Sequence, residues 1–114
     1  MQLVNLTPHS LNLYTPTGVV EVPASGQLAR VRSTSEVAGE VIGMPVVRAS
    51  FEPVTGLPEP RPNTFFLVST LVLTALRAEG VHRDDLLAPG TGPNDGAVRN
   101  AAGQVMGVTR LVTI

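Results

Sequence analysis

Five polar side chains in the second half of the chain are of types that can bind an anionic ligand. Asn94 and Asp95 lie in Pro89–Gly96, a stretch rich in glycine and proline. Glycine allows close backbone approach to a ligand, and the amide and carboxylate can bind ribose hydroxyls or a base edge. Arginine is suited to bidentate binding of phosphates. The ligand-binding residues that we predict are Arg83, Asn94, Asp95, Arg99 and Arg110.

A loop and a hairpin would have to bring these side chains together. The glycine-rich loop carries the strongest loop signal in the chain. After it, Ala97–Asn100 and Gln104–Ile114 are predicted to form a hairpin. Its two arms would place Arg99 and Arg110 side by side, and Arg83 would close the site from the other end of the same connection. We expect the site to lie across a subunit boundary.

Other interpretations of the same residues stay open. The glycine-rich loop lacks the lysine of a phosphate-binding P-loop, so it is either a plain surface loop or an anion-contacting one. The arginines are either solvated side chains or members of an anion site, and a second such site would be a strand face with Arg30, Arg32 and Arg48. His82 to Asp85 could contain a base oriented by a carboxylate, or only solvated charges that cap Leu86.

Composition argues against several classes of site. There is no cysteine, and the only histidines, His9 and His82, are isolated, so we predict no metal, no cofactor and no catalytic residue. A net charge of −1 argues against general nucleic-acid binding, and no apolar run approaches the ~20 residues that cross a membrane. Charged residues make up only 15% of the chain, which indicates apolar surface left for a homo-oligomer.

The elements that hold the site are predicted around Asn63–Gly90, the longest apolar stretch. A buried strand, Thr64–Val68, leads into one helix over about Ser69–Glu79, with Ser69 as N-cap and Gly80 as the left-handed closing residue. The helix carries few polar residues, so we expect it to be nearly all buried.

Short strands account for the rest of the chain. Four prolines make Glu52–Asn63 an ordered, extended connection. We expect Val47, Ala49 and Phe51 to point inward in a tight meander. The sequence predicts an α+β, β-rich single domain (residues 1–114) of short antiparallel strands with one principal helix. The remaining predicted strands are Gln2–Leu6, Ser10–Tyr14, Val19–Val22, Gln27–Ser33, Glu36–Ile42 and Pro45–Phe51.

Short motifs along nearly the whole chain resemble a family of short proteins of uncharacterised function from phages, prophages and actinobacteria. In size and setting the chain is also similar to phage anti-Thoeris and anti-CBASS sponges, which sequester cyclic-nucleotide or cyclic ADP-ribose immune signals without cleaving them. This second resemblance is one of class and assigns no residue. The motifs that carry the first are Asn5-Leu6-Thr7-Pro8-His9, Gly39-Glu40-Val41, Met44-Pro45-Val46-Val47, Gly56-Leu57-Pro58, Leu67-Val68-Ser69, Arg83-x-Asp85-Leu86 and Gly103-x-x-x-Gly107.

The resemblance implies a small phage-type binding protein that sequesters a nucleotide-derived signal and counteracts host immune signalling. We expect it in the cytoplasm, that of the host if a phage encodes it. The alternatives are a virion or regulatory protein–protein interaction module and a nucleotide hydrolase. A binding protein needs only a preformed pocket with a few polar groups, whereas an enzyme needs a poised base or metal.

Overall fold

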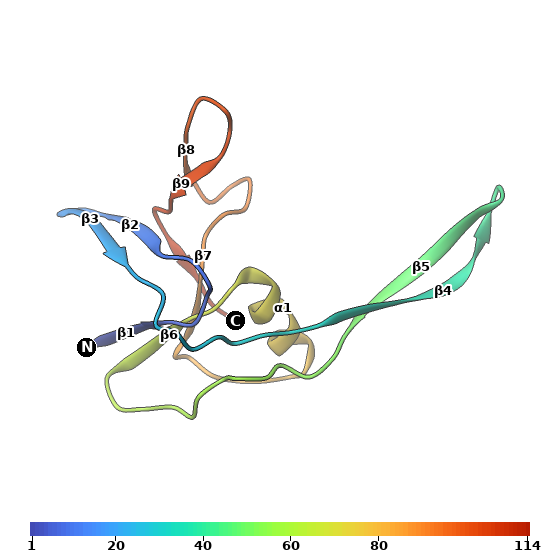
Figure 1. Ribbon diagram of the computed structural model, residues 1–114, viewed down its shortest axis with the longest axis horizontal. Helices are drawn as coiled ribbons and strands as arrows, with labels where there is room; N and C mark the ends of the chain where they lie inside the picture. Colours follow the sequence, from blue (N-terminus) through green and yellow to red (C-terminus); the bar gives the residue numbers. More distant parts are fainter.

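The structure is a computed structural model that describes all 114 residues. It has ten strands and one helix (Figure 1), which confirms the predicted β-rich α+β class. The helix is α1 (Thr70–Ala78), and the strands are β1 (Gln2–Asn5), β2 (Leu11–Thr15), β3 (Gly18–Val22), β4 (Ser33–Val41), β5 (Met44–Phe51), β6 (Thr64–Leu67), β7 (Leu86–Pro89), β8 (Val98–Arg99), β9 (Val105–Gly107) and β10 (Leu111–Val112).

A four-stranded sheet with the order β1-β6-β7-β10 forms the centre of the molecule. β6 runs parallel to both β1 and β7, whereas β10 runs antiparallel to β7. A parallel pair needs a crossover connection, and α1 lies in the connection from β6 to β7. The predicted antiparallel pairing therefore describes the hairpins β2–β3, β4–β5 and β8–β9, while the central sheet is mixed.

The predicted ends of the helix are confirmed. The Ser69 hydroxyl accepts a hydrogen bond from the Val72 amide at 3.2 Å, which satisfies one free donor of the first turn. At the other end Gly80 has a φ of 77°, and the Val81 amide donates back to the Leu76 carbonyl at 3.1 Å. This is a Schellman ending, which requires a left-handed residue at the glycine position.

The prediction that the helix is nearly all buried is wrong. Leu71 is 47% exposed and Ala78 is also exposed. Only one side of α1 packs on the sheet, where it contacts β7, and no element covers the other side. The buried helix residues are Val72, Leu73, Ala75 and Leu76.

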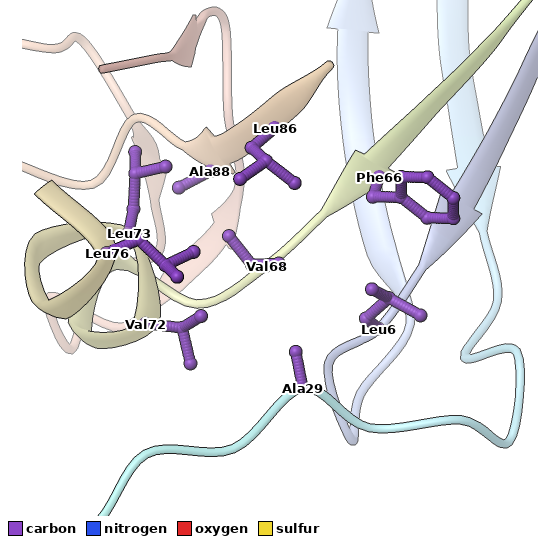
Figure 2. Close-up of a cluster of buried hydrophobic side chains, with 9 residues drawn as sticks. All are labelled: Leu6, Ala29, Phe66, Val68, Val72, Leu73, Leu76, Leu86 and Ala88. Carbon is purple, nitrogen blue, oxygen red and sulfur yellow. The ribbon is translucent and has the colours of Figure 1, made fainter. Parts of the chain in front are cut away.

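The core is small and lies between α1 and the central sheet (Figure 2). Phe66, in the middle of the sheet, is fully buried, and Leu6 packs beside it just after β1. Only 17 of 114 residues are buried, so much of the chain lies outside this core. The nine core residues are Leu6, Ala29, Phe66, Val68, Val72, Leu73, Leu76, Leu86 and Ala88.

The predicted strand Gln27–Ser33 is not formed over most of its length. The Ala29 amide bonds to the Leu6 carbonyl, and Arg30 makes one isolated bridge with Thr55. The segment beside it, which begins with Glu52 and Pro53, adds only the bond from the Glu52 amide to the Arg32 carbonyl, so no continuous ladder forms and strand structure starts only at β4. The connection after β5, Glu52–Asn63, contains neither helix nor strand beyond the Thr55 bridge, as its prolines predict.

The hairpin β4–β5 projects from the molecule as a long arm (Figure 1). Every residue of both strands is exposed, so the prediction that Val47, Ala49 and Phe51 point inward is wrong. The radius of gyration is 16.4 Å, whereas a compact chain of this length has about 13 Å. The alternating pattern predicts these strands correctly, but the face with Val47, Ala49 and Phe51 does not cover the core of its own chain.

Candidate functional site

The glycine-rich loop Pro89–Gly96 follows the carboxyl end of β7. Its shape is fixed by Asp95, whose Oδ2 accepts a hydrogen bond from the Gly92 amide at 2.8 Å. The Thr109 hydroxyl donates to the Gly96 carbonyl at 3.0 Å and ties the loop to the C-terminal segment. The Asp95 carboxylate therefore holds the loop together, while the exposed Asn94 side chain makes no hydrogen bond.

The predicted hairpin that brings Arg99 and Arg110 onto facing arms is wrong. β8 and β9 form only a short pair, in which Arg99 lies opposite Val105. After β9 the chain crosses β2, where the Val108 amide donates to the Asn12 carbonyl, and then joins β7 as β10. The end of the chain belongs to the central sheet, because β10 forms an antiparallel backbone ladder with β7.

The two arginines nevertheless contact the same loop. Arg99 donates to the Thr91 carbonyl at 3.3 Å and to the Gly103 carbonyl at 3.0 Å. The Gly90 amide donates to the Arg110 carbonyl at 3.0 Å, and a methyl group on Gly90 would lie 2.7 Å from Cγ of Arg110. Arg99 is thus bonded to protein carbonyls. The guanidinium of Arg110 has no hydrogen bond and no ion pair.

Arg110 lies at an apolar hollow of about 280 Å³ between β2 and the C-terminal segment. Tyr14 is 36% exposed there, and its ring rests on Gly107, where any side chain would collide with the ring. The hollow thus combines an aromatic ring with one unpaired cation. The lining residues are Leu13, Tyr14, Thr15, Pro16, Val108, Thr109, Arg110 and Leu111.

Tyr14 is not among the site residues predicted from the sequence. The available signal was the alternation of β2, which separates Tyr14 from the apolar face of Leu11 and Leu13. No sequence signal linked Tyr14 to Arg110, since their place at the same hollow depends on the path of the chain after β9.

Arg83 lies at the other end of β7 and is bonded to the protein. Its Nε and Nη2 donate to the two carboxylate oxygens of Asp85 at 2.9 and 2.7 Å, and Nη1 donates to the Pro58 carbonyl at 2.9 Å. These hydrogen bonds lower the pKa of Asp85 and raise that of Arg83, while burial opposes both shifts. The structure therefore separates Arg83 from the other predicted site residues and uses it to tie the proline-rich connection to β7.

A more polar hollow of about 520 Å³ lies beside this ion pair. It is lined by Arg61 and Arg83, but also by Asp84 and Asp85. The opposite charges nearly cancel, and one arginine is already bound to a carboxylate. The apolar hollow at Arg110, whose only charged lining residue is that arginine, is the better candidate for an anion site.

The segment Asn5–His9 contains several polar side chains that could bind a ligand, but its polar groups form hydrogen bonds with one another. The Asn5 side chain, 1% exposed, donates to the His9 and Val22 carbonyls at 2.8 and 3.0 Å. Its Oδ1 accepts from the amide and the hydroxyl of Thr7 at 2.9 and 2.6 Å. All bonding groups of this amide are occupied, so Asn5 organises the turn between β1 and β2 and is not available to a ligand.

Comparisons with protein-family models, with curated proteins and with solved structures each give no match. No helix of the structure is long and apolar enough to span a membrane.

Proposed function

We propose that this protein is a binding protein that sequesters a small nucleotide-derived anion without cleaving it, and that it works as a homo-oligomer. The observation that supports this best is that the unpaired guanidinium of Arg110 and the partly exposed ring of Tyr14 line the same hollow. An aromatic ring can stack on a nucleobase, and an arginine can bind a phosphate in a bidentate manner.

The size of the hollow restricts the ligand. Its volume of about 280 Å³ lies just below the range of roughly 300–1,000 Å³ that is typical of small-molecule pockets. One base can therefore occupy the hollow, with its phosphate at the rim near Arg110. A cyclic nucleotide or a cyclic ADP-ribose type of signal has this combination of ring and phosphate.

The absence of acid–base groups from the hollow favours binding over catalysis. Hydrolysis of a phosphodiester needs a base or a metal placed near the phosphate. The lining residues include no carboxylate, imidazole or thiol. We therefore propose sequestration ahead of hydrolysis at this site.

Retention of intact ligand tests this function. The protein is incubated with cyclic dinucleotides and cyclic ADP-ribose, separated from free ligand and denatured, and the released compound is analysed by mass spectrometry. Release of unchanged ligand supports sequestration, and release of a cleaved product supports a hydrolase. If no ligand is retained, the proposal fails.

Calorimetry on variants then tests the site. Arg110→Ala should weaken binding by about 1.5–3 kcal/mol, the usual loss for a charge-assisted hydrogen bond, and Tyr14→Leu by about 1–3 kcal/mol for lost base stacking. The control is Arg77→Ala on the exposed side of α1, which should bind within twofold of wild type. Binding within twofold in both test variants would place the site elsewhere.

A second candidate function is that of a protein–protein interaction module. The observation that favours it is the exposed β4–β5 arm, which contributes nothing to the core of its own chain. Under this function the protein would retain no nucleotide.

A further inference from the structure

The outer half of the β4–β5 arm is out of step with the half next to the body. The last pair of the inner half is Val37 with Val47. The next pair outward is Gly39 with Val46, so two steps along β4 match one step along β5. Ala38 is left without a partner, as in a β-bulge. The outer pairs are therefore shifted by one residue from the register that the inner pairs set.

The turn at the tip contains a strained residue. Val41 pairs with Met44, so the turn consists of Ile42 and Gly43, whose φ values are 51° and 76°. Two positive φ values are typical of a type I′ turn, which favours asparagine before glycine, whereas a β-branched residue with positive φ is an outlier. Ile42 is 95% exposed, so packing does not compensate for the strain.

Continuing the inner register to the tip would remove the bulge and the strain together. Ala38 then pairs with Val46 and is no longer left over. Glu40 pairs with Met44, and this becomes the last pair before the turn. Pairs alternate between hydrogen-bonded and non-bonded, so Pro45, which has no amide hydrogen, falls at a non-bonded pair next to the closing pair in both registers.

The turn of this second register has three residues, Val41, Ile42 and Gly43. Three-residue hairpin loops commonly consist of a type I turn followed by one residue in the left-handed conformation. Gly43 takes the left-handed position, as it does in the observed turn. Ile42 returns to a negative φ, which a β-branched residue adopts without strain.

The body of the molecule does not select between the two registers. Register is specified strongly where one face of a strand is buried, and weakly in strands that are exposed on both faces. Every residue of β4 and β5 is exposed, and neither strand pairs with any strand besides the other. A shift confined to the outer half also leaves the inner ion pair of Glu36 and Arg48 in place.

We propose that the outer half of the arm, residues 38–46, is a two-state element that exchanges between the observed register and the second register. The observed register has the two-residue turn that matches the twist of the strands, but it contains the bulge and the strained Ile42. The second register has the relaxed backbone and the longer loop. Opposing preferences of this kind are typical of a minor state populated at about 0.1–10%. The exchange does not depend on the proposed ligand site at Arg110.

The two registers present different surfaces at the tip. In the observed register Val41, Met44 and Val46 lie on one face and form an exposed apolar patch. Glu40 pairs with Pro45 and lies on the opposite face. In the second register Glu40 pairs with Met44 and enters the patch, while Val41 moves into the turn. The exchange thus switches the tip between an apolar and a charged surface.

NMR exchange measurements on the isotope-labelled full chain test the proposal. Relaxation dispersion and saturation transfer detect minor states that exchange on the μs–ms timescale. The amides of residues 38–46 should report one common minor state with strand-like chemical shifts, whereas residues 34–36 and 48–50 keep their register and should show no exchange. The proposal is overturned if residues 38–46 show no exchange, if their minor state has the shifts of an unfolded chain, or if the exchange extends over both halves of the arm.

Two variants shift the equilibrium in opposite directions. Ile42→Asn creates the Asn–Gly turn that type I′ geometry favours, so the minor population should fall at least tenfold. Val41→Pro places proline at the position that it prefers in a type I turn and removes an amide at the closing pair of the observed ladder, so the second register should become the major one. Nuclear Overhauser contacts between Glu40 and Met44 should identify it, and its shifts should match those of the minor state of the wild type.

The matched control is Ile42→Val, which keeps a β-branched residue at the strained position and should exchange within twofold of wild type. If Ile42→Asn exchanges as Ile42→Val does, strain at the turn does not drive the second register and the proposal fails. It also fails if Val41→Pro retains the pairing of Gly39 with Val46.

Discussion

Replacing Asn5 by alanine should destabilise the protein by about 3 kcal/mol, a large part of the 5–15 kcal/mol that is typical of whole domains. The side chain is 1% exposed and makes four hydrogen bonds. Its removal leaves the Thr7 amide and the Val22 carbonyl without these partners, while the His9 carbonyl keeps only the Thr7 hydroxyl at 3.0 Å. A buried group that loses its partner costs about 1–3 kcal/mol, and we take the lower end because the two carbonyl bonds are only partly buried.

Urea denaturation measures this loss. With a slope of about 1.5 kcal/mol per M, typical of small proteins, the midpoint should fall by about 2 M with the slope unchanged. The matched control is Asn12→Ala, since the Asn12 amide makes a single exposed bond of 3.2 Å to the Met106 carbonyl. It should cost about 0.5 kcal/mol or less. If the midpoint of Asn5→Ala lies within about 0.5 M of that of Asn12→Ala, the bonding network is not what stabilises the β1–β2 turn.

Two further substitutions probe the site and the ion pair. Gly107→Ala should destabilise the protein by about 1–3 kcal/mol through overpacking, because the new methyl group collides with the Tyr14 ring. It should also weaken nucleotide binding. The control is Gly39→Ala, whose methyl group meets no atom within 4 Å, and equal melting temperatures of the two variants would refute the clash. The second substitution is Asp85→Asn. Because the pKa of Asp85 is lowered in the folded state, its ion pair stabilises the fold above the ordinary carboxyl pKa of 3.8, and this stabilisation is lost as pH falls through the lowered pKa. Between pH 7 and pH 3 the wild type should therefore lose more stability than Asp85→Asn. The difference should be at most about 1 kcal/mol, because pH 3 lies less than one unit below the ordinary carboxyl pKa of 3.8. Equal losses in urea titrations at the two pH values would contradict it.

Local signals in the sequence located the helix because its ends depend on neighbouring residues. Ser69 and Gly80 act through backbone groups within one turn of the helix, so their types were sufficient to place it. The amount of buried helix surface was not predictable in the same way. Leu71 is apolar, yet it is 47% exposed because no second layer covers that side of α1.

Long-range pairing limited the prediction of the candidate site. Arg99 and Arg110 were placed on one hairpin by their proximity in sequence, but the end of the chain gains more backbone pairing from β7. In the structure Arg110 contacts the glycine-rich loop, whereas Arg83 forms an ion pair with Asp85, two residues along the chain. An arginine in a sequence indicates a capacity to bind anions, and only the fold decides whether a carboxylate or a carbonyl of the same chain occupies it.

The β4–β5 arm shows a related limit of prediction from sequence. Alternation in β5 marks Val47, Ala49 and Phe51 as one face that should be covered, but a period of two does not say by which chain. A core of nine residues leaves no room for this face. The low fraction of charged residues indicates exposed apolar surface, and seven of the fourteen exposed large apolar side chains lie on the arm, with the other seven on the rest of the molecule. The alternation therefore predicts which side chains of β5 share a face, and only the fold shows that the chain itself leaves this face uncovered.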